Sequence, residues 1–437
     1  MKTQYLLLPL ICLVLSCIRM PQQYNIISPG IWRASLVLND SREVIVTRSI
    51  DKVVTRDANP ESTKTLIPFN FEVIYRNDSS FYIEVINGTE RIRFDSIEYG
   101  RNIKTGNDTM VIYLTPYASV IRCIYENNKM AGEFIILDKV NYSIPFEASY
   151  GQSYRFVKIP EKSNLQINGS WNAIFAKDSS DQFNAIGEFQ QNGQKVTGTF
   201  RTETGDFRYL SGEISGDKLM LSTFDGAHAF LFKADISDTL MTGVYYSGKH
   251  YQCSWEARRS DHDPLIHADS MSRVISILPL ALNLQNSEGR WVSLNDPAYM
   301  NKPKIIQITG SWCPNCRDES EFLRDFIKDN PDEDLSFLAV AFERGHNRER
   351  SLARLAEYKR AMKIPYEVVL GGTANRDTAS ALFPQIDGIK AYPTMLFVDR
   401  FNHIIHVHTG FDGPATSRFN SFREYFHKSV EELKKIK

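Results

Sequence analysis

Two cysteines separated by two residues, Cys313 and Cys316, are the side chains of this 437-residue chain best suited to do chemistry. The apolar run at 304–308 before them is typical of a buried strand, and the residues after them, from 317 to about 330, are typical of a helix. Such a junction places the first sulfur at a helix N-terminus, where unpaired backbone N–H groups and the helix dipole stabilise a thiolate. A thiolate beside a second thiol can exchange disulfides, so the spacing predicts a redox-active dithiol.

A zinc site is the alternative use of such a pair. Zinc in proteins normally takes four ligands, and the sequence has no second Cys-x-x-Cys and no histidine pair at a suitable spacing. Three histidines, His403, His406 and His408, fall on one predicted strand, but no neighbouring cysteine or carboxylate completes a metal site. We therefore expect solvent-exposed strand histidines, no metal and no cofactor.

The first seventeen residues are typical of an export signal. An apolar run over 5–15 follows Lys2, and the small and apolar residues before Cys17 resemble the lipobox of bacterial lipoproteins. This resemblance implies cleavage before Cys17 and acylation of its sulfur, which would anchor the protein to a membrane. An ordinary signal peptide with an incidental cysteine is the alternative. No later segment is apolar enough to span a bilayer.

The length and composition are those of a multidomain folded protein. A chain of 437 residues can bury the cores of two or three domains. Its 51 basic and 52 acidic residues give a formal net charge of −1, and no basic patch stands out. We therefore expect no nucleic-acid partner.

The segment from Gly30 to 259 reads almost entirely as strands and tight turns. Gly30-Ile31-Trp32 is echoed by Gly169-Ser170-Trp171, and eight short strands follow between 170 and 257. This pattern predicts an N-terminal all-β region of tandem β-meander or barrel-like units, produced by duplication. A single large barrel-like domain is the alternative.

Two further cysteines, Cys123 and Cys253, lie in strand-like segments of this region. They could form a structural disulfide, because an exported protein meets an oxidising compartment. Sequence alone does not give the separation that a disulfide needs, and buried free thiols are the interpretation we favour.

After a polar stretch, strands alternate with helices to the end of the sequence, which predicts a C-terminal α/β domain. The predicted organisation is a signal peptide with lipobox at 1–17, a tether at 18–28, β unit 1 at 29–160, β unit 2 at 161–260, a linker at 261–275 and the α/β domain at 276–437.

The run Trp312-Cys313-Pro314-Asn315-Cys316 at a strand–helix junction resembles the active site of the thioredoxin superfamily. Tyr392-Pro393-Thr394 resembles the cis-proline loop that faces the dithiol in that superfamily. The hairpin that opens the domain, an insertion between the central strands and Glu319 resemble the TlpA/ResA-like, AhpC/TSA-related branch. The resemblance covers 276–437 and implies a thioredoxin-like fold with thiol–disulfide oxidoreductase activity.

The resemblance also implies roles for individual residues. Cys313 is expected to attack the substrate disulfide, and Cys316 to resolve the mixed disulfide. Trp312 is expected to line the substrate groove, and the loop at Tyr392, cis-Pro393 and Thr394 to bind an extended substrate segment.

Glu319 has two possible roles: a proton shuttle for Cys316, or an acid that complements the helix N-terminus, as expected for Asp318. The order of the residues between the cysteines, Pro314 then Asn315, departs from the usual pattern of the branch, so the redox potential cannot be carried over.

These features together predict a lipid-anchored protein of the cell envelope that faces the periplasm and reduces disulfides of substrate proteins. A membrane thiol electron donor would supply the electrons. A thioredoxin-fold peroxidase is one alternative, but Ile305 and Gly310 stand where a peroxidase motif requires Pro and Thr. A ligand- or partner-binding β-barrel lipoprotein with an accessory redox domain is the other.

Overall fold

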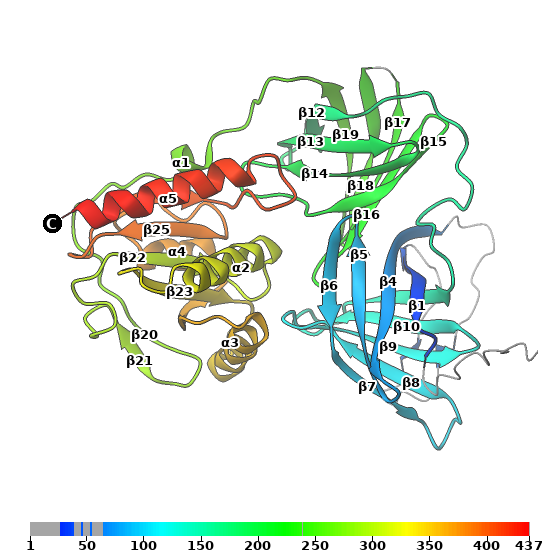
Figure 1. The fold of residues 1–437 in the computed structure, drawn as a ribbon, viewed down its shortest axis with the longest axis horizontal. Coiled ribbons are helices and arrows are strands. Elements are labelled where there is room, and N and C mark those ends of the chain that lie inside the picture. The colour runs from blue at the N-terminus through cyan, green and yellow to red at the C-terminus, as the bar shows by residue number, and fades with distance from the viewer. Residues whose placement is uncertain (1–26, 39–44, 47–52, 55–63, 238, 437) are drawn as a thin grey trace, which may run out of the picture.

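The computed structural model describes residues 27–38, 45–46, 53–54, 64–237 and 239–436 (Figure 1). The predicted signal peptide, Cys17 and most of the tether lie outside the described residues. The described chain forms a nine-stranded sheet, a closed barrel and a five-stranded sheet with helices. In Figure 1 the helical part lies on the left, the barrel at the upper right and the nine-stranded sheet at the lower right.

The first β unit is one antiparallel sheet in the order β6-β5-β4-β1-β11-β10-β9-β8-β7. Buried and partly exposed residues alternate strictly along β5, as expected of a sheet with one face on the core. A short pair, β2 (Ile45–Val46) and β3 (Val53–Val54), forms between β1 and β4. The strands of the sheet are β1 (Gly30–Leu38), β4 (Thr65–Asn77), β5 (Ser80–Asn87), β6 (Glu90–Phe94), β7 (Ser96–Arg101), β8 (Asp108–Tyr113), β9 (Ser119–Glu126), β10 (Lys129–Ile136) and β11 (Ser143–Tyr150).

The second β unit is a closed up-and-down barrel of eight strands, and the eight predicted strands are confirmed. Before β15, which begins at Leu210, residues 202–209 form a loop that reaches the helical part. Aromatic rings fill the interior: Phe200 stacks on Phe232 at 4.8 Å between ring centroids. The strands are β12 (Gly169–Phe175), β13 (Phe183–Asn192), β14 (Lys195–Arg201), β15 (Leu210–Ser215), β16 (Lys218–Phe224), β17 (Ala229–Ile236), β18 (Leu240–Ser247) and β19 (Tyr251–Arg259).

The two β units begin in the same way. Gly30 and Gly169 both adopt positive φ, 102° and 101°. Two residues after each glycine stands a tryptophan whose indole N–H donates to the carbonyl four residues before it, at 2.9 Å for Trp32 and 3.0 Å for Trp171. In each unit the first strand pairs with the last, β1 with β11 and β12 with β19. This shared geometry supports the predicted duplication. The alternative of one large barrel is wrong, because the units form separate sheets.

The C-terminal part has a mixed sheet in the order β24-β23-β22-β25-β26, with the first three strands parallel to one another. Alternate residues of its strands pack on two different cores. One face lies against α2, α3 and α5, and the other against α4 and the hairpin segment before β22. The elements are β20 (Asn283–Gln285), β21 (Trp291–Ser293), β22 (Lys304–Thr309), α2 (Pro314–Asp329), β23 (Ser336–Glu343), α3 (Arg348–Met362), β24 (Glu367–Thr373), α4 (Arg376–Leu382), β25 (Thr394–Val398), β26 (Ile404–Thr409) and α5 (Phe419–Lys435). None of the helices in the described part of the chain combines the length and the apolar composition needed to cross a bilayer.

The predicted linker at 261–275 is bonded to the parts on both sides of it. It carries the short helix α1 (Ala268–Met271), and Asp263 forms ion pairs with Arg201 of the barrel and Arg418 near α5. Asp269 lies 2.7 Å from Nδ1 of His408. The segment is therefore bonded to its neighbours at Asp263 and Asp269, although most of its residues are exposed.

The expectation of exposed histidines is wrong for His408, which is 2% exposed because α1 covers it. The other two histidines each lie beside one carboxylate: His406 is 2.9 Å from Glu432, and His403 is 3.2 Å from Asp399. Among the described residues no group of three or more His, Cys, Asp or Glu side chains could hold a metal ion.

Cys123 and Cys253 are both free thiols in the structure. Cys123 is buried, as favoured from the sequence, whereas Cys253 is only partly buried. The two cysteines therefore do not form the alternative structural disulfide.

Candidate active site

Cys313 and Cys316 form a disulfide at the N-terminus of α2, with their Cα atoms 5.2 Å apart. Cys313 is the N-cap, and its sulfur accepts a hydrogen bond from the backbone N–H of Cys316 at 3.2 Å. Pro314 starts the helix, a position that suits proline because its missing N–H would have no partner there. Cys313 is 6% exposed and Cys316 is fully buried. The first sulfur is thus the accessible one, and it lies where N–H groups stabilise a thiolate.

The loop at Pro393 faces this pair. The Tyr392–Pro393 peptide bond is cis, as expected from the resemblance, and the carbonyl oxygen of Tyr392 lies 3.7 Å from Cys313 Sγ. Gly410 N–H donates to the Pro393 carbonyl at 2.8 Å and ties the loop to the end of β26. Thr394 is fully buried, and its hydroxyl donates to the Ala391 carbonyl at 2.9 Å. Its side chain therefore holds the loop.

Trp312 is half-buried beside the dithiol. Its indole N–H donates to the carbonyl of Phe342 at 2.9 Å, and its ring meets that of Tyr392 edge-on at 5.6 Å. The guanidinium of Arg344 lies 4.5 Å from the centre of the indole ring. Three neighbours thus fix the ring at the position predicted for a groove-lining residue.

Glu319, one helical turn after Cys316, is completely buried. Within the described chain neither of its carboxylate oxygens has a hydrogen-bond partner. Burial raises the pKa of Glu319 to about 8, against a smaller lowering effect of the Gln307 side chain. Glu319 lies beyond the first turn of α2, so it does not complement the helix N-terminus. The proton-shuttle role stays a prediction.

Gln307 lies on β22 beside the dithiol. Its side-chain amide donates to the Cys316 carbonyl at 3.2 Å, while its oxygen accepts from Ser320 and Tyr366 at 3.1 and 3.2 Å. These bonds connect the central strand to the first turns of α2.

Sequence analysis missed a carboxylate that holds the segment before Cys313. Glu343, at the end of β23, is 3% exposed and accepts from the backbone N–H and the hydroxyl of Ser311 at 2.8 and 2.7 Å. Ser311 and Glu343 are far apart in sequence and fit no motif. The only available signal was a charged residue at the end of an otherwise apolar strand.

Sequence analysis also missed a buried junction between the three parts. Arg208 of the barrel donates to Asp318 on α2 at 2.6 Å, and it forms an ion pair with Glu90 of the nine-stranded sheet. Beside it, Asp206 accepts from the backbone N–H of Gly413 at 3.1 Å. Asp318 therefore binds the barrel. The helix-end role expected of it is wrong, because it lies beyond the first turn of α2.

The barrel loop around Gly205 touches the Cys-x-x-Cys turn. A Cβ atom added at Gly205, whose φ is +156°, would lie only 1.9 Å from Nδ2 of Asn315. A Cβ at Gly410, with φ of +87°, would lie 2.6 Å from the carbonyl oxygen of Thr204. Glycine allows the close contact at both positions. Through these contacts the barrel covers one side of the dithiol.

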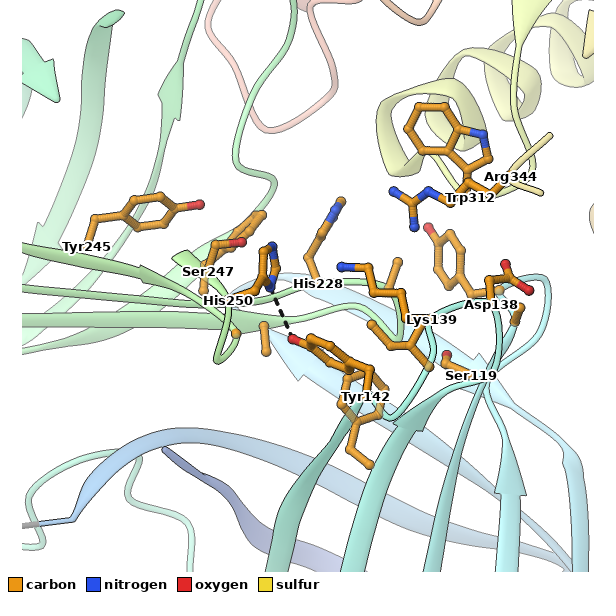
Figure 2. Close-up of a pocket in the computed structure, with 18 residues that line it drawn as sticks. Ser119, Asp138, Lys139, Tyr142, His228, Tyr245, Ser247, His250, Trp312 and Arg344 are labelled. Carbon is orange, nitrogen blue, oxygen red and sulfur yellow. Dashed lines mark hydrogen bonds between the residues drawn. The ribbon is translucent and has the colours of Figure 1, made fainter. Parts of the chain in front are cut away.

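A cavity of about 180 Å³ lies on the Trp312 side, where the three parts meet (Figure 2). Figure 2 shows side chains from both β units together with Trp312 and Arg344 around it, with the Tyr142 hydroxyl directed at His250. Its lining includes Tyr117, Ser119, Asp138, Lys139 and Tyr142 of the first unit, His228, Phe230, Tyr245, Ser247 and His250 of the barrel, and Trp312 and Arg344.

No protein-family model matches the sequence, and no curated protein matches it. Similar solved structures cover only the C-terminal part. A thiol-disulfide oxidoreductase from Bacteroides fragilis is 16% identical over 33% of this chain and 96% of its own, with a TM-score of 0.26. A thiol:disulfide interchange protein of the thioredoxin family from Chlorobium tepidum is 19% identical over 37% of this chain and 99% of its own, with a TM-score of 0.28. StoA from Bacillus subtilis is 18% identical over 35% of this chain and 99% of its own, with a TM-score of 0.26.

Proposed function

We propose that residues 276–437 are a thioredoxin-like thiol–disulfide oxidoreductase that reduces substrate disulfides through Cys313 and Cys316. The observation that carries this proposal is the geometry of the first sulfur. It caps α2, accepts the Cys316 N–H at 3.2 Å and lies 3.7 Å from the Tyr392 carbonyl beside cis-Pro393. A sulfur in this position is stabilised as a thiolate and can approach a substrate from the loop side.

The reaction has two exchange steps. In the dithiol form, the Cys313 thiolate attacks one sulfur of the substrate disulfide, forms a mixed disulfide and releases the other sulfur as a thiolate, which takes up a proton. Cys316 then loses its proton and attacks Cys313 Sγ, which closes the Cys313–Cys316 disulfide and releases the second substrate thiol. Two electrons have passed from the protein to the substrate, and an external dithiol must return them.

Glu319 would accept the Cys316 proton in the second step. It is buried on the same helix, one turn farther along, and its carboxyl has no hydrogen-bond partner in the described part of the structure. Burial raises its pKa to about 8, so a proton can be taken up and released near neutral pH.

The cellular setting is proposed from the N-terminal sequence. Cys17 after the lipobox would be acylated, so that the protein stands on a membrane of the cell envelope and faces the periplasm. Its substrates would be disulfide-bearing proteins, and a membrane thiol donor would re-reduce the dithiol. The β units contact the redox part around Arg208, which supports a role for them in presenting substrates to the dithiol.

The decisive experiment traps the intermediate. Cys316→Ser should accumulate a mixed disulfide through Cys313 with a substrate protein, and the wild-type protein should reduce insulin. Cys253→Ser is the matched control, since that partly buried thiol lies outside the site. No trapped adduct together with no insulin reduction would refute the proposal. A measured potential of about −270 mV would indicate a reductant, and about −120 mV an oxidant.

A further inference from the structure

The cavity beside Trp312 is built from all three parts of the protein. Lys139 and Tyr142 come from the segment between β10 and β11, His228 and His250 from the barrel, and Trp312 directly precedes the attacking cysteine. The barrel loop at Gly205 covers the Asn315 side of the dithiol. A substrate group that approaches from the Trp312 side therefore meets both β units as well as the redox part.

The charged groups of this cavity are predominantly cationic. Lys139 and Arg344 line it, and Asp138 is the one carboxylate in the described lining. His228 lies 3.8 Å from the buried carboxylate of Asp225. Within the described chain, no carboxylate oxygen lies within ion-pair distance of Lys139 or Arg344. Their contacts are instead with aromatic rings: Lys139 Nζ lies 4.7 Å from the centre of the Tyr142 ring, and Arg344 lies over Trp312.

The titration of these groups reflects burial and neighbouring cations, while Asp138 and Glu343 partly oppose the lowering of the Arg344 pKa. Burial, followed by the neighbouring Lys139, His228 and Arg344, lowers the pKa of His250. Burial and Arg344 likewise lower the pKa of Lys139. Cations that destabilise one another in a partly desolvated cavity would be stabilised by a bound anion.

The size of the cavity limits that anion to a small group. Its volume is about 180 Å³, and a cavity of about 150 Å³ holds a molecule the size of benzene. Aromatic rings supply the walls, and the Tyr142 hydroxyl lies 3.2 Å from Nδ1 of His250 at one side (Figure 2). A carboxylate on a short carbon chain fits these dimensions, whereas a folded domain does not.

The geometry points to this cavity as a subsite that receives a carboxylate carried within a few bonds of the substrate's disulfide sulfur. This inference rests on the proposed thiol–disulfide exchange at Cys313. When Cys313 forms the mixed disulfide, the sulfur it attacks retains its substituent, and the carboxylate of that substituent lies near Lys139 and Arg344. Cys316 then expels the acidic thiol, so the electron balance is that of the exchange already described.

The test compares small disulfides that differ mainly in charge. The pre-reduced full chain is mixed with 3,3′-dithiodipropionate, which is anionic, or with bis(2-hydroxyethyl) disulfide, which is neutral, and the second-order rate constants are measured. The ratio of the two constants should fall about tenfold from wild type to Lys139→Gln/Arg344→Gln, equivalent to about 1.4 kcal/mol of lost recognition. Comparing ratios cancels the intrinsic reactivities of the two compounds.

Matched variants separate recognition from general effects. Lys139→Arg retains the charge and should keep most of the wild-type ratio, and Lys129→Gln, at an exposed position of β10, should not change it. Added salt should lower the wild-type ratio, because it screens the attraction. A disulfide-bridged peptide with Glu beside its cysteine, compared with its Gln counterpart, tests a protein side chain as the source of the carboxylate.

A preference for the anionic compound in either series supports the subsite. The series that shows it identifies the source of the carboxylate, a small molecule or a protein side chain. Equal ratios for wild type and the double variant in both series would overturn the subsite and leave the proposed function standing. A wild-type protein that reduces neither the neutral disulfide nor insulin would overturn the proposed function, and the subsite with it.

Discussion

The Arg208 side chain of the barrel lies 2.6 Å from Oδ2 of Asp318, on the first turns of the helix that carries the dithiol. Both side chains are buried, and the same guanidinium also pairs with Glu90 of the nine-stranded sheet. One cation therefore neutralises carboxylates from two other parts of the protein. The position of α2 relative to both β units depends on it.

Replacing Arg208 should destabilise the whole protein. Arg208→Met leaves Asp318 and Glu90 as buried carboxylates without their partner, which costs about 3–5 kcal/mol when a buried ion pair is broken from one side. Chemical denaturation would measure the loss. Arg122→Met, at an exposed position of β9, should stay within about 0.5 kcal/mol of wild type. Equal stability of both variants would show that the junction contributes nothing.

Glu319 should make stability depend on pH. Burial raises its folded-state pKa from 4.5 to about 8, so the folded protein holds a proton that the unfolded chain releases. The resulting stabilisation is present in full below about pH 4.5 and is lost as the pH rises through about 8. Between these limits wild type should lose more stability than Glu319→Gln, measured by denaturation at several pH values. Glu349→Gln, at an exposed position of α3, should follow wild type.

Glu319 should also affect the second exchange step. If it takes the Cys316 proton, Glu319→Gln slows release of the substrate thiol and shifts the pH profile of that step, while the attack by Cys313 keeps its rate. A removed proton transfer of this kind costs about 10²–10⁴-fold in rate. Rapid-quench measurement of the mixed disulfide would separate the two steps. An unchanged release rate and profile would exclude the shuttle.

Gly205 should resist substitution because of Asn315. Gly205→Ala introduces a Cβ within 1.9 Å of Asn315 Nδ2 and strains the backbone at φ of +156°, so a loss of about 1–3 kcal/mol is expected. Adding Asn315→Ala should recover part of this loss, because it removes the clashing atoms. Gly106→Ala, at φ of +71° with no atom near the added Cβ, shows the cost of a milder backbone strain without a clash. Additive effects of Gly205→Ala and Asn315→Ala would contradict the contact.

Cys17 should determine membrane attachment. Cys17→Ala removes the proposed acylation site, so the protein should leave the membrane fraction, while its purified form should keep insulin reduction. Fractionation and mass spectrometry of the N-terminus would test the attachment, and an insulin-reduction assay would test the activity. Membrane retention of the variant at the wild-type level would exclude a lipid anchor at this residue.

The sequence predicted those features that depend on local pattern. The dithiol at a strand–helix junction and the eight barrel strands follow from spacing, alternation and turn residues within short windows. The proline loop follows from the resemblance of Tyr392-Pro393-Thr394 to the cis-proline loop of the thioredoxin superfamily. Contacts such as Arg208 with Asp318, Gly205 with Asn315 and His408 with Asp269 join residues more than a hundred positions apart. Such contacts produce no periodic pattern in the sequence. A polar loop residue also has the same sequence pattern whether it contacts solvent or another domain. The cavity at Trp312 was missed for this reason, because three separate segments form it.

The pairing of first with last strand has a consequence for the time course of biosynthesis. The barrel closes only when β19 reaches β12, so its ladder cannot be completed until the chain has been made past Arg259. In the first unit, β1 likewise lacks one of its two partner strands until β11 has been synthesised. Contacts this distant in sequence form slowly, and unpaired strand edges invite association between chains in the interval. The barrel therefore stays open until shortly before the two cysteines of the redox site have been synthesised.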